Sequence, residues 1–195
     1  MKDLPKINPP IAVKSDQPYH PYHRDCEKLA RSWAIPGTAG LEHRIGGLEK
    51  TAKGNVSYVP ENHEMMVNTR EEKVQRVANE IPDLKVFGAP KGDLLLVGWG
   101  GSYGYLITAV RELQAEGYDV SLANFNYINP LPKNVKDVFN NYKKIVVAEL
   151  NLGQLANYLR MKHQEFTYEQ INKVQGIPFT INDIKDKCIN MLEGM

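Results

Sequence analysis

The sequence is poor in the residues that mark several common kinds of site. It has only two cysteines, Cys26 and Cys188, and they lie far apart, so we expect reduced thiols and a cytoplasmic protein. Two scattered cysteines cannot hold an iron–sulfur cluster. No H-E-x-x-H zinc motif, no C-x-x-C pair and no phosphate loop ending in Gly-Lys-Ser/Thr is present. The sequence therefore offers no assembled metal, redox or nucleotide triphosphate motif.

Neither charge nor hydropathy indicates nucleic acid or a membrane as a partner. Lys and Arg number 24 against 23 Asp and Glu, a net charge of +1, so there is no basic excess for an anionic polymer or lipid surface. Residues 94–110 carry no charge, but four glycines interrupt this run and it is short for a membrane span. Met1-Lys2-Asp3 does not open a signal peptide. A content of 42% apolar and 24% charged residues is typical of a globular protein.

The chain is organised around residues 92–104, which read GDLLLVGWGGSYG. Leu94–Val97 is an unbroken apolar run, as expected of a parallel strand that is covered on both faces. Ser102 is a candidate N-cap for an amphipathic helix that Gly117 ends. The order strand, glycine turn and helix predicts an α/β unit.

Dinucleotide-binding domains open in the same way, but the fingerprint is incomplete here. A G-x-G-x-x-G pattern that starts at Gly98 needs a glycine where Tyr103 stands, and no carboxylate follows the second expected strand, Asp119–Ala123. We assign the glycines to turn conformation and close packing, with nucleotide binding as the alternative. On this assignment Gly101→Val should reduce stability more than ligand binding.

From residue 92 onward, strands alternate with helices. This pattern predicts a three-layer α/β domain over 92–195, with a mostly parallel sheet and helices on both faces. The strands are expected at 94–97, 119–123 and 145–150, with a fourth near 173–174, and the helices at 102–116, 134–142, after Gly153, and from a cap at Thr180 or Asn182 to Leu192.

Residues 1–91 are expected to form a connecting arm against this domain rather than a second globule. The arm would contain a proline-rich strap with a short helix over 25–33, two short strands within 41–60, and a helix over 61–81 that Pro82 ends. Its exposed apolar residues would be Trp33, Ile35, Met65 and Met66. The spacing H-x-x-H-x-x-C of His20, His23 and Cys26 suits a metal, but without a second ligand cluster we favour a surface strap.

Ligands of open α/β sheets bind beyond the carboxyl ends of the strands, and two turns there are rich in polar groups. The candidate ligand-binding residues are Gly101, Ser102, Asn151, Gly153 and Gln154. Glu149 follows an apolar strand, and Asn151 can cap the next helix, whose N-terminus could hold an anion. A helix cap with a satisfied carboxylate is the alternative to a ligand contact. We assign no catalytic and no metal-binding residue.

Several segments together resemble a known family. LLLVGWGGSYG, YINPLPKN, KKIVVAELNLGQLANYLR and KVQGIPF are similar to the C-terminal part of the α subunit of 2-oxoacid:ferredoxin oxidoreductases, most closely the 2-oxoglutarate type. RSWAIPGTAGLEHRIGGLEK and PENHEMMVNTREEKV resemble the region that connects to it. The resemblance covers nearly the whole chain and implies a fold like the C-terminal domain of transketolases.

The resemblance implies a fragment of a larger enzyme, which oxidatively decarboxylates a 2-oxoacid to an acyl-CoA and reduces ferredoxin. Thiamine diphosphate, magnesium and an iron–sulfur cluster would belong to the full complex, with the remainder of the α subunit and a β subunit as partners and ferredoxin and CoA as reactants. The chain alone would bind none of these cofactors, would be inactive, and could self-associate. The alternatives from other classes are a stand-alone nucleotide- or CoA-binding module and a structural interaction domain.

Overall fold

The computed structural model describes residues 8–194, and the chain divides into two compact units, Met1–Val77 and Ala78–Met195. The division lies earlier than the boundary at 91/92 that the sequence suggested. The reason is that residues 86–87, expected to belong to a linker, form a strand of the second unit's sheet.

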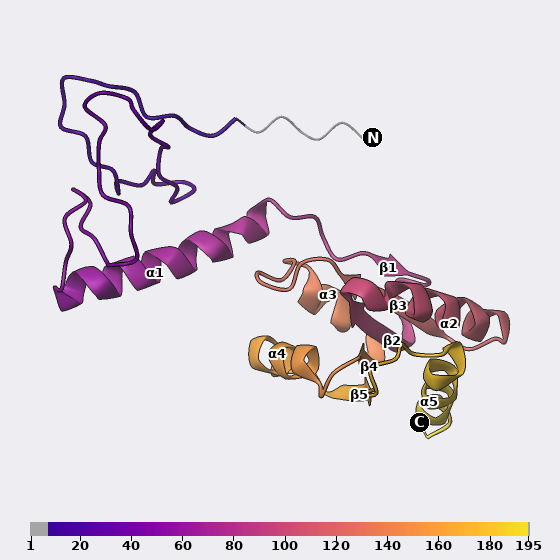
Figure 1. Ribbon diagram of the computed structural model, residues 1–195. Coiled ribbons are helices and arrows are strands. Elements are labelled where there is room, and N and C mark those ends of the chain that lie inside the picture. The colour runs from indigo at the N-terminus through magenta and orange to yellow at the C-terminus, as the bar shows by residue number, and fades with distance from the viewer. Residues whose placement is uncertain (1–7, 195) are drawn as a thin grey trace. The chain divides into compact units, whose positions relative to one another are not determined.

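The second unit is built on a five-stranded sheet (Figure 1). In spatial order the strands are β1 (Val86–Phe87), β3 (Val120–Phe125), β2 (Gly92–Trp99), β4 (Tyr142–Glu149) and β5 (Tyr168–Asn172). All neighbouring strands run parallel except β1, which pairs antiparallel with β3. The expected strand Leu94–Val97 lies inside the central strand β2, and its four side chains are 0% exposed.

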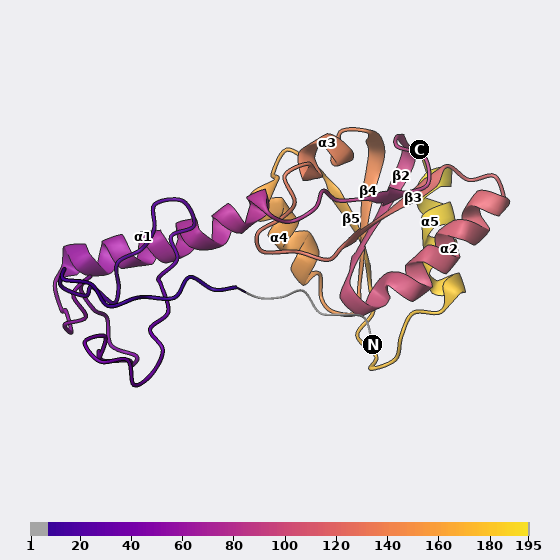
Figure 2. The same ribbon diagram turned by 90° about the horizontal axis from the view of Figure 1, so that it is seen from above.

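Helices cover both faces of this sheet, so the unit has three layers (Figure 2). The helices of one face are α2 (Tyr103–Ala115) and α5 (Ile181–Glu193), and those of the other are α3 (Val135–Phe139) and α4 (Gln154–Lys162). Leu94 and Leu96 pack against α2 and α5, whereas Leu95 and Val97 pack toward α3 and α4. Because successive side chains of a strand point to opposite faces, an unbroken apolar run is required for two cores.

The predicted α/β sheet with helices on both faces is confirmed, although two elements are placed differently. The fourth strand lies at Tyr168–Asn172 and not near 173–174, although the N–H of Lys173 still donates to the carbonyl of Glu149 at the end of β4. The Lys173 ammonium lies 2.7 Å from the Asp183 carboxylate. The helix expected over 134–142 covers only Val135–Phe139, and Tyr142 already begins β4. The cap expected at Thr180 is confirmed, since its hydroxyl accepts the N–H of Asp183 and the Asp183 carboxylate accepts the N–H of Thr180.

The first unit contains one long helix, α1 (Pro60–Arg76), which continues as a 3₁₀ turn, Val77–Asn79. This agrees closely with the helix expected over 61–81, and Met65 is exposed as expected. Met66 is not, because its side chain is 6% exposed. None of the helices formed by residues 8–194 is long and apolar enough to cross a membrane.

Two expectations for the rest of the first unit were wrong. The helix expected over 25–33 is absent, because the Asp25 carboxylate accepts the N–H groups of Glu27, Lys28 and Ala30 and so stabilises a turn. The two strands expected within 41–60 reduce to one antiparallel bridge between Lys50 and Val56. The unit therefore depends on side-chain contacts to the backbone more than on regular structure.

Candidate functional site

The order of the strands places a crevice at the carboxyl ends of β2 and β4. From β2 the chain moves to β3 on one side, and it then crosses to β4 on the other side of β2. In open α/β sheets such a reversal of direction is where ligands bind. A hollow of about 260 Å³ lies at this point. It is lined by Trp99, Gly101, Ser102, Tyr105, Ala148, Glu149, Leu150 and Asn151.

The two polar turns that the sequence indicated therefore meet in one place. Gly101 and Ser102, which lie in the 3₁₀ turn η2 (Gly100–Ser102), line the hollow together with Asn151 from the turn after β4. Gly153 and Gln154 do not line it, since they lie at the start of α4. Three of the five candidate residues thus share one crevice.

Glu149 brings a charged side chain to the lining of the crevice, and it is buried, with 1% of its surface exposed. Its Oε1 accepts the N–H of Ala156 at 2.9 Å, and its Oε2 accepts the N–H of Leu155 at 2.8 Å. The side-chain amide of Asn151 also donates to Oε2. The carboxylate therefore satisfies backbone donors in the first turn of α4, where the helix dipole also favours a negative charge.

Asn151 completes this cap, as the sequence predicted. Its Oδ1 accepts the N–H groups of Gly153 at 2.8 Å and Gln154 at 2.9 Å. Four successive N–H groups at the start of α4 are thus bonded to Asn151 or Glu149. The Glu149 carboxylate occupies the position at this helix N-terminus where an anionic ligand could have bound. This arrangement matches the alternative given by the sequence, a helix cap with a satisfied carboxylate.

The glycines that close packing and the turn conformation require are Gly98 and Gly100, and not Gly101 as the sequence suggested. A Cβ on Gly98 would overlap Leu106 Cδ1 and would lie 3.1 Å from Ser102 Oγ. Gly100 has a φ of +57°, which favours glycine. A Cβ on Gly101 would meet nothing within 4 Å, and its φ is not positive. The expectation that Gly101→Val mainly reduces stability therefore has no structural basis.

Residues 100–104 also read G-x-S-x-G, the pattern of the nucleophilic serine of α/β-hydrolases. That serine needs an exposed Oγ and a nearby base. Here Ser102 is 7% exposed, its Oγ donates to the carbonyl of Trp99 at 2.8 Å, and no histidine lines the crevice. Ser102 stands at the N-cap position of α2, but its hydroxyl holds the turn at Trp99 and does not cap the helix.

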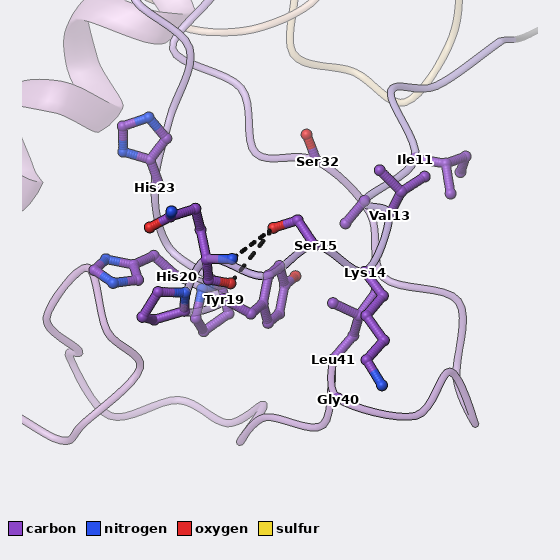
Figure 3. Close-up of a pocket in the computed structure, with 14 residues that line it drawn as sticks. Ile11, Val13, Lys14, Ser15, Tyr19, His20, His23, Ser32, Gly40 and Leu41 are labelled. Atoms are coloured by element: carbon purple, nitrogen blue, oxygen red, sulfur yellow. Dashed lines mark hydrogen bonds between the residues drawn. The ribbon is translucent and has the colours of Figure 1, made fainter.

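The first unit contains a hollow of its own, of about 560 Å³ (Figure 3). His20 and His23 line it, whereas Cys26 does not. Among residues 8–194 no group of three His, Cys, Asp or Glu side chains lies close enough to hold a metal ion. The hydrogen bonds drawn in the hollow join only Ser15 and Gln17.

Comparison with known proteins gives a consistent family. Residues 92–184 match the family model described as pyruvate:ferredoxin oxidoreductase core domain II. The chain is 46% identical over 189 residues to the 2-oxoglutarate oxidoreductase subunit KorA of Mycobacterium tuberculosis, which covers 93% of this chain. It is 27% identical over 155 residues, 77% of this chain, to the 2-oxoacid:ferredoxin oxidoreductase subunit alpha of Saccharolobus solfataricus.

A solved structure agrees with these relatives. The 2-oxoglutarate:ferredoxin oxidoreductase from Magnetococcus marinus, with 2-oxoglutarate, coenzyme A and succinyl-CoA bound, matches 92% of this chain with a TM-score of 0.82 and 27% identity. The chain spans 28% and 24% of the two curated relatives and 32% of this structure. The chain thus belongs to the 2-oxoacid:ferredoxin oxidoreductase family, is similar to part of its α subunit, and carries core domain II over residues 92–184.

Proposed function

We propose that this chain is a piece of the α subunit of a 2-oxoglutarate:ferredoxin oxidoreductase, which oxidatively decarboxylates the 2-oxoacid to an acyl-CoA and reduces ferredoxin. The observation that carries this proposal is the 46% identity over nearly the whole chain to a 2-oxoglutarate oxidoreductase subunit. The crevice supports a contributing role rather than catalysis, because Glu149 is engaged in a helix cap and Ser102 in a turn.

The cofactors of the reaction would be held elsewhere in the enzyme. Thiamine diphosphate with magnesium needs a diphosphate site with carboxylate or amide ligands, and a cluster needs cysteine thiolates. In this chain Cys26 and Cys188 are free. Calorimetry of the isolated chain with thiamine diphosphate and Mg²⁺ is expected to give no binding heat. Saturable micromolar binding would contradict the proposed division of labour.

The crevice itself would contact a neighbouring part of the enzyme. Its lining includes two exposed apolar side chains, since Trp99 is 37% and Leu150 42% exposed. Exposed apolar side chains that gather at one place mark interaction sites. The space beside Gly101 leaves room for a close approach. We assign Gly101, Ser102 and Asn151, which line the crevice, to this contact, with Gly153 and Gln154 next to it at the start of α4 and a bound ligand as the alternative occupant.

The first unit would make a second contact of the same kind. Its large exposed apolar side chains include Trp33 at 65%, Ile35 at 57%, Tyr58 at 85% and Met65 at 48% exposure. The remainder of the α subunit and a β subunit are the partners that the proposal implies. Without them, the isolated chain is expected to self-associate, which light scattering at increasing protein concentration would reveal.

A chimera tests the proposal directly. The segment of the M. tuberculosis subunit that matches this chain is replaced by this chain, and the protein is produced with the remaining subunits of that enzyme. We expect an assembled enzyme that reduces a viologen dye in a reaction dependent on 2-oxoglutarate and CoA. An assembled chimera that lacks this activity, while the parent enzyme retains it, would refute the proposed function.

A matched pair of variants tests the proposed contact at the crevice. Leu150→Asp places a charge on an apolar side chain that lines the crevice, and Met161→Asp places one on an apolar side chain of α4, 68% exposed, that does not line it. Leu150→Asp is expected to reduce assembly of the chimera, and Met161→Asp is not. Equal assembly of the two variants would remove the crevice from the interface.

A further inference from the structure

A second hollow of the α/β unit lies beside β3, apart from the crevice between β2 and β4. Its volume is about 500 Å³, within the range of small-molecule sites. A smaller hollow of about 180 Å³ adjoins it, and Lys85, Asn124 and Asn126 line both. The larger hollow is lined by Lys85, Val86, Phe87, Gly100, Tyr103, Leu122, Asn124 and Asn126. Neither Ser102 nor Glu149 takes part in it.

Asn124, near the carboxyl end of β3, is the polar group at its wall. The Oδ1 atom of Asn124 is buried and has no hydrogen-bond partner among the residues that the structure describes. This oxygen faces Gly98 of the neighbouring strand, 3.3 Å from where a Cβ would stand. Asn124 lines both hollows, and among residues 8–194 its side-chain N–H groups have no acceptor, so they are available to a ligand there.

The charge that the described residues bring to the larger hollow is positive. Among residues 8–194, Lys85 is the only charged residue that lines it, and no Asp or Glu does. The guanidinium of Arg111 lies over the Phe87 ring, 5.4 Å from its centre, and adds positive charge next to this residue of the lining. Asp83 lines only the smaller, adjoining hollow. Together, an ammonium and amide donors without carboxylates form an environment that suits an anion.

The remaining walls are apolar or aromatic. Leu122 is 1% exposed, Phe87 packs against the same core, and Tyr103 is 49% exposed. Aromatic faces of this kind accept a flat ring by stacking. The hollow therefore combines a place for a ring with donors for an anionic group, which is the usual composition of a ligand site.

We propose that this hollow binds a small aromatic phosphate of the nucleoside monophosphate type, with its ring against Phe87 and Tyr103 and its phosphate on Lys85 and the Asn124 amide. The binding mode differs from that of dinucleotide domains, because it uses side chains and not the glycine turn as a phosphate cradle. It does not depend on the proposed oxidoreductase function, since every residue that carries it belongs to this chain.

Calorimetry and thermal unfolding of the full chain test the proposal with four probes: AMP, phenyl phosphate, adenosine and inorganic phosphate. AMP is expected to bind saturably and to raise Tm, because a ligand of the native state stabilises it. Adenosine and inorganic phosphate, which each lack one half of the recognised chemistry, should bind more weakly. Binding of phenyl phosphate without AMP would support the aromatic phosphate chemistry with a source other than a nucleotide.

Variants assign the binding to this hollow. Lys85→Ala is expected to weaken AMP binding by about tenfold, because it removes a charged donor. Lys91→Ala, an exposed lysine that lines neither hollow, is the matched control. Asn124→Leu should also weaken AMP binding while leaving Tm without ligand unchanged or higher, since its oxygen has no partner to lose. Asn126→Ala, at an exposed position, provides a second test if Asn124→Leu fails to fold.

Two results would overturn the proposal. One is the absence of millimolar or tighter binding of both AMP and phenyl phosphate to the unaltered chain. The other is equal affinity of the Lys85→Ala and Lys91→Ala variants for whichever probe binds, because Lys85 would then have no part in recognition.

Discussion

The side-chain amide of Asn151 donates a 3.0 Å hydrogen bond to the carboxylate of Glu149. Glu149 ends β4, and Asn151 follows two residues later. The side chains of both accept backbone N–H groups at the start of α4. A buried carboxylate, which would be costly to desolvate alone, is thus compensated by three donors. The pair fixes the direction in which the chain leaves the sheet at the crevice.

Glu149→Gln is predicted to destabilise the chain by about 1–3 kcal/mol, because an amide N–H₂ would face a backbone N–H that needs an acceptor. Urea unfolding monitored by circular dichroism measures the change. Glu193→Gln, at an exposed position near the end of α5, is the control and should unfold like the unaltered chain. A Glu149→Gln variant as stable as the control would mean that the cap contributes little.

Gly98→Ala is predicted to destabilise the chain by about 1–3 kcal/mol, since its methyl group would overlap the side chain of Leu106, which is completely buried. Gly101→Ala, three residues along the same turn, should change stability by less than about 1 kcal/mol, because its Cβ points into open space. Thermal unfolding of the two variants side by side tests the assignment. The opposite order of stability would contradict the packing described for the turn.

The sequence was sufficient to predict the elements that depend on one dominant physical signal, such as an apolar run or a capping side chain. The apolar runs at Leu94–Val97 and Ile145–Ala148 predicted buried parallel strands, because only two-sided burial needs such runs. Thr180 and Asn151 predicted helix starts through the known capping preference of their side chains. The rule for the carboxyl ends of strands selected the two polar turns, and three of the five candidate residues, Gly101, Ser102 and Asn151, line one crevice.

What could not be predicted depends on contacts between residues far apart in the sequence. Val86–Phe87 is too short for a strand signal and forms one only through its pairing with β3. Nothing in the sequence distinguishes Gly98, which touches Leu106, from Gly101, which touches nothing. The hollow at Asn124 was missed for the same reason, since Lys85 and Tyr103 meet it only in the folded sheet.

The two cysteines are predicted to differ in reactivity. Cys188 is completely buried, and burial raises the pKa of its thiol to about 12, so almost no thiolate is present at neutral pH. Cys26 is exposed. Alkylation with iodoacetamide, followed by mass spectrometry, should modify Cys26 first and Cys188 only after denaturation. Equal modification of both in the native chain would show that the core around α5 opens readily.

The last prediction concerns acid. The ammonium of Lys173, 2.7 Å from Asp183, and the backbone N–H of Thr180 lower the pKa of the Asp183 carboxyl from 3.8 to about 2. A carboxyl with a lowered pKa in the folded state contributes stability that is complete above its unfolded pKa and is lost as the pH falls through its folded pKa. The contribution of Asp183 should therefore be complete above about pH 4 and decline toward pH 2.

Asp183→Asn removes this contribution, so the difference in Tm between the unaltered chain and the variant should shrink as the pH falls from about 4 to 2. The other carboxyls that titrate in this pH range affect the Tm of both proteins alike, so their contribution cancels in the difference. Asp186→Asn, at an exposed position on the same helix, is the control, and its Tm is measured at the same pH values. Because Asp183 is 38% exposed, high salt should reduce the effect of Asp183→Asn. A Tm difference that stays constant down to pH 2 would mean that the Lys173–Asp183 contact does not hold the start of α5 in solution.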